Sequence, residues 1–374
     1  MQSREKRRES FPNPAFVRKR WKALDGTWQF AFDGNDIENV EFPMEIRVPF
    51  CYQSEMSGIG TDEPHEVVWY RREFSLTEEE LSGNVLLRFG AVDNKAMVWI
   101  NKQYVGLHEG GNVPFVFEVS KYLHAGTNEI TVKAEDSFSK EIPRGKQMWS
   151  QKPRGCCYTN TTGIWQSVWL EFTGSNYITN IYITPEFDQN RAKISVRTKM
   201  EKNITLKAQF SLGDRELGEV VMCPKEGKAE GLFTFEEFGP EAVFKLWWTP
   251  EIPNLIDVNV TLLEDGEELD QVNTYFGMRK IHKEGDKIFL NNNLLYQRLV
   301  LDQGYWAESL MTPPSNEAVK KDVELTKAMG FNGARKHQKI DDPRYYYWAD
   351  KLGLLVWGEL PSAYDFTAAS RKRL

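Results

Sequence analysis

Charged and polar side chains follow three separate apolar runs in the last quarter of the sequence. Asp302 follows the first run and Glu359 ends the third, while Arg335 and His337 follow the second. If the runs are parallel strands, their carboxyl ends meet at one edge, as they do around the active site of a (β/α)8 barrel. Hydroxyl groups accept hydrogen bonds from arginine and donate them to carboxylates. The pattern therefore suits a ligand with several hydroxyl groups, such as a sugar.

Each of these residues also has a purely structural interpretation. Asp302 could cap a loop. Arg335 could form an internal ion pair with Glu359 or Asp302, which would still be compatible with a binding role. His337 could be an ordinary loop histidine. Trp357 could line the pocket, but a tryptophan in a strand more often belongs to the core.

Asp341 and Asp342 look like paired acids, but helix capping explains them better. Pro343 follows them, and proline is favoured at the first position of a helix. We therefore expect these two carboxylates to cap a helix rather than to carry chemistry.

The elements that would position these residues alternate between strand and helix from about residue 279. The predicted strands are 297–301, 331–336 and 354–359. The predicted helices run from Ser315 to Gly330 and from Asp342 to Gly353. This order with short connections requires a parallel sheet with right-handed crossovers.

The length of this unit falls short of a complete barrel. A closed (β/α)8 barrel needs about 250 residues, and 96 residues remain from residue 279. Residues 367–374 are typical of the start of a third helix, and an open three-stranded sheet would leave apolar edges exposed. We therefore expect residues 279–374 to be the first part of a truncated barrel, in an N-terminal fragment of a longer protein.

Upstream of residue 279 the patterns are those of short strands separated by turns. The first series is 27–32, 67–76, 84–92, 96–106, 114–120, 128–136 and 165–172. The second series is 178–184, 192–200, 204–212, 218–223, 243–248 and 255–264. We expect a jelly-roll sandwich over residues 1–175 and an immunoglobulin-like sandwich over residues 176–278.

The composition excludes several classes of protein. Of the 374 residues, 41% are apolar, which is enough to form cores. No apolar run approaches the roughly 20 residues that cross a bilayer. A net charge of -7 argues against a nucleic-acid partner, and the basic residues 1–22 are interpreted as a solvated leader. Because no run could cross a bilayer, we expect no membrane partner. Four cysteines do not make a disulfide scaffold, so we expect a cytoplasmic protein.

Several stretches, in order along the chain, together resemble glycoside hydrolase family 2, the family of β-galactosidases, β-glucuronidases and β-mannosidases. They are FPNPAFVRKRWKALDGTWQFAFD, WYRREF, GAVDNKAMVWIN, VGLHEGGNVPFVFEVS, TTGIWQSVWLE, WWTPEIPNLIDVNVTL, TYFGMRKI and the segment from LVLDQGYW to GELPSAYDF. The resemblance covers nearly the whole chain. It implies a sugar-binding jelly roll, an immunoglobulin-like domain and a (β/α)8 barrel.

The resemblance also implies roles for the candidate residues. Arg335 matches an arginine that lies near the terminal sugar in the family, and Asp302 stands where the family places polar residues that contact substrate. His337 stands one position before the histidine of the galactosidases. Glu359 aligns with a carboxylate that binds Mg²⁺ in some β-galactosidases, although WGELP differs from that subgroup. No cofactor is expected to be required, and Mg²⁺ at Glu359 is the one candidate.

The residues of the reaction itself are not expected in this chain. Retaining glycosidases need two carboxylates about 5–5.5 Å apart. In this family both are glutamates, the first in an Asn-Glu pair after the fourth barrel strand and the second after the seventh. Asn128–Glu129 lies in a predicted strand and Asn316–Glu317 opens a predicted helix, so neither fits. Both catalytic glutamates are therefore expected beyond Leu374.

Three functional hypotheses remain at this stage. The first is a retaining exo-β-glycosidase whose N-terminal fragment supplies part of the sugar subsite and is inactive alone; the full-length protein could be a homo-oligomer. The second is a carbohydrate-binding protein without catalysis, since jelly rolls often serve as lectin modules. The third is a structural scaffold, which would not explain the charged strand ends. The long segment 146–165 either reaches the barrel mouth or is an ordinary surface connection.

Overall fold

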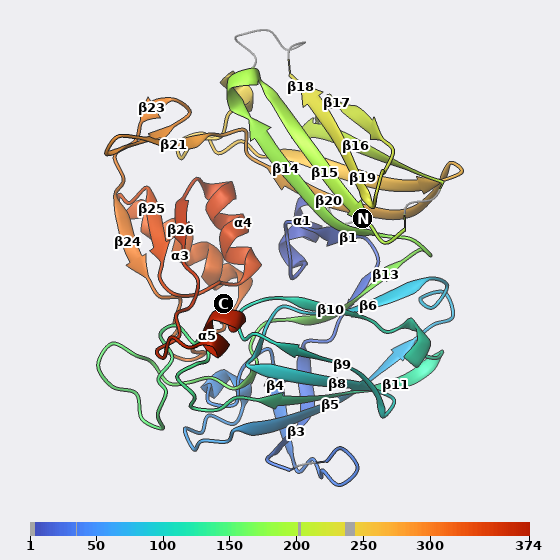
Figure 1. Cartoon of the computed structure of the whole chain (residues 1–374), viewed down its shortest axis with the longest axis vertical. Coiled ribbons are helices and arrows are strands. Elements are labelled where there is room, and N and C mark those ends of the chain that lie inside the picture. Colours follow the sequence, from blue (N-terminus) through green and yellow to red (C-terminus); the bar gives the residue numbers. More distant parts are fainter. Residues whose placement is uncertain (1–3, 35, 201–202, 236–243) are drawn as a thin grey trace.

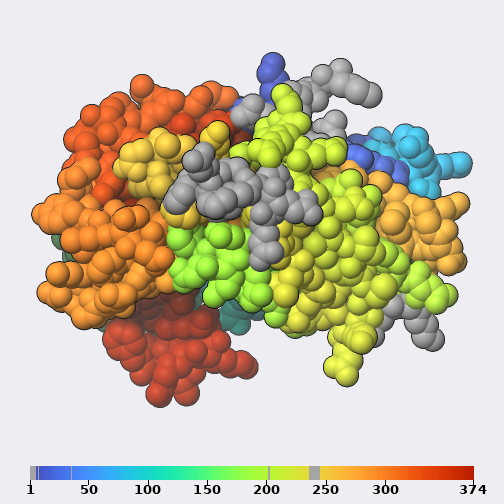
Figure 2. Space-filling model, turned by 90° about the horizontal axis from the view of Figure 1, so that it is seen from above, coloured from blue at the N-terminus to red at the C-terminus, as the bar shows by residue number. Residues whose placement is uncertain are grey.

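Two antiparallel β-sandwiches and one α/β unit follow each other along the chain. The structure, a computed structural model, describes residues 4–34, 36–200, 203–235 and 244–374. In Figure 1 the first sandwich lies below, the second above it, and the α/β unit, in orange and red, beside them. Figure 2, seen from above, shows the α/β unit against the flank of the second sandwich.

The first sandwich is formed by strands whose buried residues alternate with more exposed ones. In β8, Ala96, Val98 and Ile100 are buried and the residues between them are only partly covered. A sheet in the order β10–β6–β13–β2 and a sheet in the order β4–β3–β5–β11–β8–β9 share one apolar core. The strands of this sandwich, with the small pair β7 and β12, are β2 (Trp21–Ala23), β3 (Gly26–Phe32), β4 (Met44–Val48), β5 (Val67–Leu76), β6 (Asn84–Phe89), β7 (Val92–Asp93), β8 (Lys95–Ile100), β9 (Gln103–Glu109), β10 (Phe115–Glu118), β11 (Gly126–Glu135), β12 (Gly163–Ile164) and β13 (Val168–Thr173).

The predicted strand 96–106 is in fact two strands. β8 and β9 form a hairpin whose turn is Asn101–Lys102, with φ angles of 49° and 64°. A two-residue turn with positive φ at both residues matches the right-handed twist of the two strands that it joins. The turn contains no glycine or proline, and Asn101 alone is a weak turn signal.

The second sandwich has a five-stranded and a three-stranded sheet around its own core. The sheet orders are β1–β20–β19–β16–β17 and β14–β15–β18. Its strands are β1 (Val17–Arg18), β14 (Ile178–Glu186), β15 (Arg191–Thr198), β16 (Ile204–Leu212), β17 (Arg215–Met222), β18 (Lys228–Thr234), β19 (Ile256–Glu264) and β20 (Glu267–Phe276). The predicted strand 243–248 is wrong: residue 243 lies outside the described residues, and Phe244–Leu246 form a single 3-10 turn.

The basic leader is not simply solvated, as the sequence suggested. Residues Arg4–Ser10 form helix α1, and β1 pairs with β20 of the second sandwich. Arg8 is buried and pairs with Asp257 at 2.9 Å. Arg18 is buried between the two sandwiches. These arginines hold the leader in the fold because buried cations require carboxylate partners.

The α/β unit has the predicted strand–helix–strand–helix–strand order. Its parallel strands β24 (Leu299–Asp302), β25 (Gly333–Lys336) and β26 (Leu355–Gly358) lie in that order. Helices α3 (Asn316–Ala328) and α4 (Pro343–Leu352) pack on one face of this sheet. The unit also has β21 (Ile281–Glu284), β22 (Lys287–Leu290), β23 (Asn293–Leu294) and helix α5 (Ala368–Arg373). No described helix is long and apolar enough to cross a bilayer.

The predicted helix boundaries of this unit are confirmed. The Ser315 side chain accepts a hydrogen bond from the Ala318 backbone, which caps α3. Asp342 caps α4, and Gly353 ends it with a φ of 80° in the left-handed region. The loops that follow β24 and β25 therefore end at fixed points, the N-caps of α3 and α4.

Candidate functional site

Alternate residues of the three parallel strands point to opposite faces of the sheet. Leu301, Arg335 and Trp357 occupy one row of the register, and their side chains are 54%, 46% and 48% exposed. The adjacent row, Val300–Ala334–Val356, packs against α3 and α4. The first row therefore lies on the face that no described helix covers. We call this the open face.

Three of the predicted site residues come together on the open face. The Arg335 guanidinium and the His337 ring both contact the Glu359 carboxylate, with His337 Nδ1 2.6 Å from Oε2. The Gln338 backbone N–H donates to the same oxygen at 3.2 Å. Burial of Glu359 is slight, and its hydrogen bonds from Arg335 and His337 prevail and lower the pKa of its carboxyl. Glu359 is therefore ionised at neutral pH.

The contacts of His337 also indicate which of its two ring nitrogens carries a proton. Its Nδ1 lies 3.2 Å from the Arg335 guanidinium, which can only donate, and closer to Glu359, which can only accept. Nδ1 must therefore carry a proton and donate it to Glu359. In the neutral ring, Nε2 is then an acceptor, 3.4 Å from the Gln338 amide nitrogen.

Trp357 belongs to the open face and not to the core. It is the register neighbour of Arg335 and is half exposed. An indole ring beside a charged cluster offers an apolar surface on which the apolar face of a sugar ring could stack. The open face therefore combines fixed hydrogen-bonding groups with an aromatic surface.

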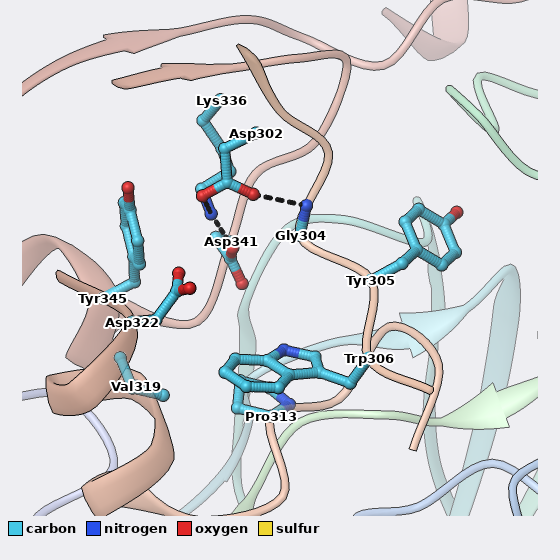
Figure 3. Close-up of a pocket in the computed structure, with 10 residues that line it drawn as sticks. All are labelled: Asp302, Gly304, Tyr305, Trp306, Pro313, Val319, Asp322, Lys336, Asp341 and Tyr345. Carbon is cyan, nitrogen blue, oxygen red and sulfur yellow. Dashed lines mark hydrogen bonds and ion pairs between the residues drawn. The ribbon is translucent and has the colours of Figure 1, made fainter. Parts of the chain in front are cut away.

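Asp302 lies on the other side of the sheet. Its carboxylate pairs with Lys336 at 2.5 Å and accepts a hydrogen bond from the Gly304 backbone at 2.7 Å (Figure 3). Lys336 is buried, pairs also with Asp341 at 2.8 Å, and lies 3.6 Å from the centre of the Tyr345 ring. Asp302 thus belongs to a buried ion network and does not join the Arg335 cluster.

This ion network borders a small cavity. Figure 3 shows Asp302, Asp322 and Trp306 around it, from β24, α3 and the loop after β24. Its volume is about 70 Å³, whereas ligand pockets usually measure about 300–1,000 Å³. Burial and the nearby Asp302 raise the pKa of Asp322. The cavity can hold water molecules but not a sugar ring.

The prediction that both Asp341 and Asp342 are capping residues is half wrong. Asp342 caps α4, but the buried Asp341 pairs with Lys336 and with Lys339 at 3.2 Å. Burial opposes ionisation of Asp341, yet the two ammonium groups prevail and lower its pKa to about 2. The sequence carried no signal for these lysines, because a buried lysine is unusual and its partner cannot be read from spacing.

The long segment 146–165 reaches the α/β unit, so it is not an ordinary surface connection. The rings of Tyr158 and Tyr305 are stacked at 3.9 Å, and Tyr158 donates a hydrogen bond to Gln303 at 2.6 Å. Trp149 contacts Tyr364 with ring centres 4.0 Å apart. The first sandwich therefore contributes residues beside the loops that follow β24 and β26.

The surroundings of Glu359 do not suit Mg²⁺. This ion prefers a set of oxygen ligands, but both oxygens of Glu359 contact nitrogen donors. Among the described residues there is no group of three or more His, Cys, Asp or Glu that could hold a metal ion.

The sequence itself matches two family models. Residues 23–173 match the model described as "Glycosyl hydrolases family 2, sugar binding domain", and residues 176–279 match "Glycosyl hydrolases family 2". Together they cover most of the chain. The chain belongs to glycosyl hydrolase family 2.

Curated relatives of this family member are considerably longer. A protein of Formosa agariphila is 30% identical over 300 residues, which is 78% of this chain and 35% of that protein. A β-galactosidase of Thermoanaerobacter pseudethanolicus is 27% identical over 354 residues, 90% of this chain and 44% of that enzyme. The family 2 chain thus spans less than half of these relatives.

Solved structures support the fold over almost the whole chain. The β-glucuronidase of Bifidobacterium dentium has a TM-score of 0.78 and 21% identity, and the match covers 92% of this chain and 62% of that one. A β-glucuronidase of Ruminococcus gnavus has a TM-score of 0.77 and 20% identity, with 98% and 64% covered. The likeness extends into the α/β unit, beyond the residues that the family models match.

Proposed function

We propose that this chain supplies sugar-recognition residues of a retaining exo-β-glycosidase, and that the open face holds part of the subsite for the terminal sugar. The observation that carries the proposal is the Arg335–Glu359–His337 cluster beside Trp357, at the carboxyl ends of parallel strands in a family 2 chain. Fixed donors and acceptors of this kind suit sugar hydroxyls.

We also propose that β24–β26, with α3 and α4, are the first units of a (β/α)8 barrel. The parallel order of the strands and the likeness to two β-glucuronidase chains support this. In such a barrel the open face would be the interior, and the Glu359 end of β26 would border the active site.

On this account the isolated chain binds sugar but does not hydrolyse glycosides. Hydrolysis by a retaining glycosidase needs two carboxyl groups about 5–5.5 Å apart, one of them able to give up a proton. In the Arg335 cluster the carboxylate is that of Glu359, and its pKa is lowered rather than raised. Asp302 points to the other side of the sheet and is paired with Lys336.

The test is a binding titration of the chain with methyl β-galactoside, β-glucuronide and β-mannoside, by calorimetry and by tryptophan fluorescence. Arg335→Ala should weaken the binding of the preferred sugar about tenfold or more, since a hydrogen bond to a charged group contributes about 1.5–3 kcal/mol. Arg197→Ala removes an exposed arginine of the second sandwich and should leave the affinity unchanged. Equal affinities in the two variants would remove Arg335 from the site.

The same preparations also test whether the isolated chain hydrolyses glycosides. We expect no release of nitrophenol from aryl β-glycosides above the buffer rate. Turnover that survives repurification would contradict this. A non-catalytic binding protein would also bind sugar without turnover. The glycosidase fragment and the binding protein therefore differ in another observation, which is whether the coding frame continues to an Asn-Glu pair after a fourth strand.

A further inference from the structure

Two adjacent cysteines lie on the long segment of the first sandwich that reaches the α/β unit. The two arms of this segment are joined by hydrogen bonds from the Met148 and Tyr158 backbone N–H groups to the carbonyls of Tyr158 and Lys146, at 2.9 and 2.8 Å. Cys156 and Cys157 directly precede Tyr158 on the returning arm, where Cys156 is exposed and Cys157 is half-buried. Neither thiol takes part in the open face.

Cys156 lies directly against an ammonium group. The Nζ atom of Lys146 is 3.4 Å from its Sγ atom. The hydrogen bond and the positive charge of Lys146 lower the pKa of the Cys156 thiol. A thiolate is the nucleophilic form of cysteine, and reactive cysteines are characteristically exposed beside a cation.

Cys157 lies beside a tyrosine hydroxyl. Its Sγ atom is 3.9 Å from the Tyr364 hydroxyl oxygen, and that hydroxyl donates its one proton to the Gly145 carbonyl at 2.6 Å. Cys157 therefore lies against a hydroxyl group that is already engaged, and not against a cation. The two neighbouring cysteines thus differ in their surroundings: Cys156 is exposed beside an ammonium group, and Cys157 is half-buried beside a tyrosine hydroxyl.

Geometry also disfavours a disulfide between the two. Consecutive Cα atoms are about 3.8 Å apart across a trans peptide, whereas disulfides usually join Cα atoms about 4.4–6.8 Å apart. A bond between Cys156 and Cys157 would therefore be strained and easily reduced. An outside sulfur atom is the better partner for Cys156.

We propose that Cys156 is a modification site that exchanges with low-molecular-weight disulfides. The Cys156 sulfur attacks one sulfur of the small disulfide, a new S–S bond forms, and the old one breaks. The leaving thiolate takes a proton from water. One disulfide replaces another, so the step needs no further oxidant, and the chain keeps a mixed disulfide at Cys156.

The other two cysteines are internal references. Cys51 is buried, and burial raises the pKa of its thiol to about 12. Cys223 is exposed after β17, and no lysine contact to it is found in the described part of the chain. Cys51 therefore reports unfolding, and Cys223 reports the rate of an ordinary exposed thiol.

The experiment treats the intact chain with 4,4′-dithiodipyridine at pH 7 and assigns each modified cysteine by peptide mass spectrometry. Cys156 should react at least about threefold faster than Cys223, because its lowered pKa increases the fraction of thiolate by more than the accompanying fall in nucleophilicity offsets. Lys146→Met should bring Cys156 to within about twofold of Cys223. Lys152→Met, which removes an exposed lysine of the same segment, should leave the rate unchanged.

Three outcomes would overturn the proposal. The first is a Cys156 rate no higher than that of Cys223, and the second is an unchanged rate in Lys146→Met. The third is a disulfide between Cys156 and Cys157 as the stable product, in place of one pyridylthio group on Cys156. Cys51 must stay unmodified in every variant, which shows that the chain remains folded. Cys157→Ser should retain the fast reaction.

Discussion

At the scale of single residues, the alternation of side chains along a strand decides which polar groups meet. Arg335, Trp357 and Glu359 come together on the open face, as the sequence suggested for a shared site. Asp302 stands in the register row of Lys336, one residue beyond the row of Arg335, so it points to the opposite face. A position at a strand end alone therefore does not decide which residues share a site.

Asp341 provides a prediction at this scale. Asp341→Asn removes the carboxylate shared by the buried Lys336 and Lys339. We expect the α/β unit to lose about 3 kcal/mol of unfolding free energy, because breaking a buried ion pair leaves uncompensated charge. Urea titration followed by hydrogen exchange of α3 and α4 measures it. Asp62→Asn, at an exposed position, should change the stability by less than about 0.5 kcal/mol.

The same carboxylate predicts the effect of acid. The pKa of Asp341 is about 2 in the folded chain against an ordinary value of 3.8. Its folded pKa is lowered, so its contribution to stability is present above about pH 4 and is lost as the pH falls toward 2. In Asp341→Asn that acid-dependent loss should be smaller by about 2 kcal/mol. An identical pH profile in both proteins would contradict the ion network.

At the scale of elements, local signals were sufficient where helices have caps and insufficient where strands are short or lie at an edge. The capping residues Ser315, Asp342 and Gly353 are legible in the sequence and are confirmed. β4 has five residues at the edge of its sheet and was missed. The pairing of β1 with β20 joins residues about 250 positions apart, which no local pattern can indicate.

Arg18 provides the prediction at this scale. It pairs with Glu171 of the first sandwich and with Asp270 of the second, at 2.9 Å for the latter, and all three are buried. Arg18→Met leaves two buried carboxylates without their shared cation. We expect a loss of about 3–5 kcal/mol and separate melting of the two sandwiches in calorimetry.

The adjacent Lys19→Met is the matched control for Arg18. Lys19 is half exposed and lies 4.0 Å from Glu268 on the surface, where such pairs contribute about 0–1 kcal/mol. Its melting profile should match that of the unaltered chain. Equal profiles for Arg18→Met and Lys19→Met would show that Arg18 does not join the sandwiches.

At the scale of the whole molecule, the open face is the feature that the fold of this chain leaves uncovered. Leu301 and Trp357 on it and Leu360 in the loop after β26 are 48–63% exposed. Such a collection of apolar side chains marks a surface for ligand or protein contact. The strand–helix pattern predicted this sheet, but only the register shows which face stays open.

The open face should therefore bind a hydrophobic dye in the folded chain. Leu301→Lys should lower the fluorescence of bound anilinonaphthalene sulfonate about twofold or more, because it places a charge in the middle of the apolar surface. Val221→Lys changes an equally exposed residue of the second sandwich and should leave the signal unchanged. The same dye signal in both variants would place the dye elsewhere.

The most direct test of the central claim is a crystal structure of the chain soaked with the β-glycoside that it binds most tightly. We expect one sugar ring on the open face, with hydroxyl groups bonded to Arg335 and Glu359 and the ring against Trp357. A sugar bound only on a sandwich surface, with the Arg335 cluster unchanged and unoccupied at saturating ligand, would contradict it.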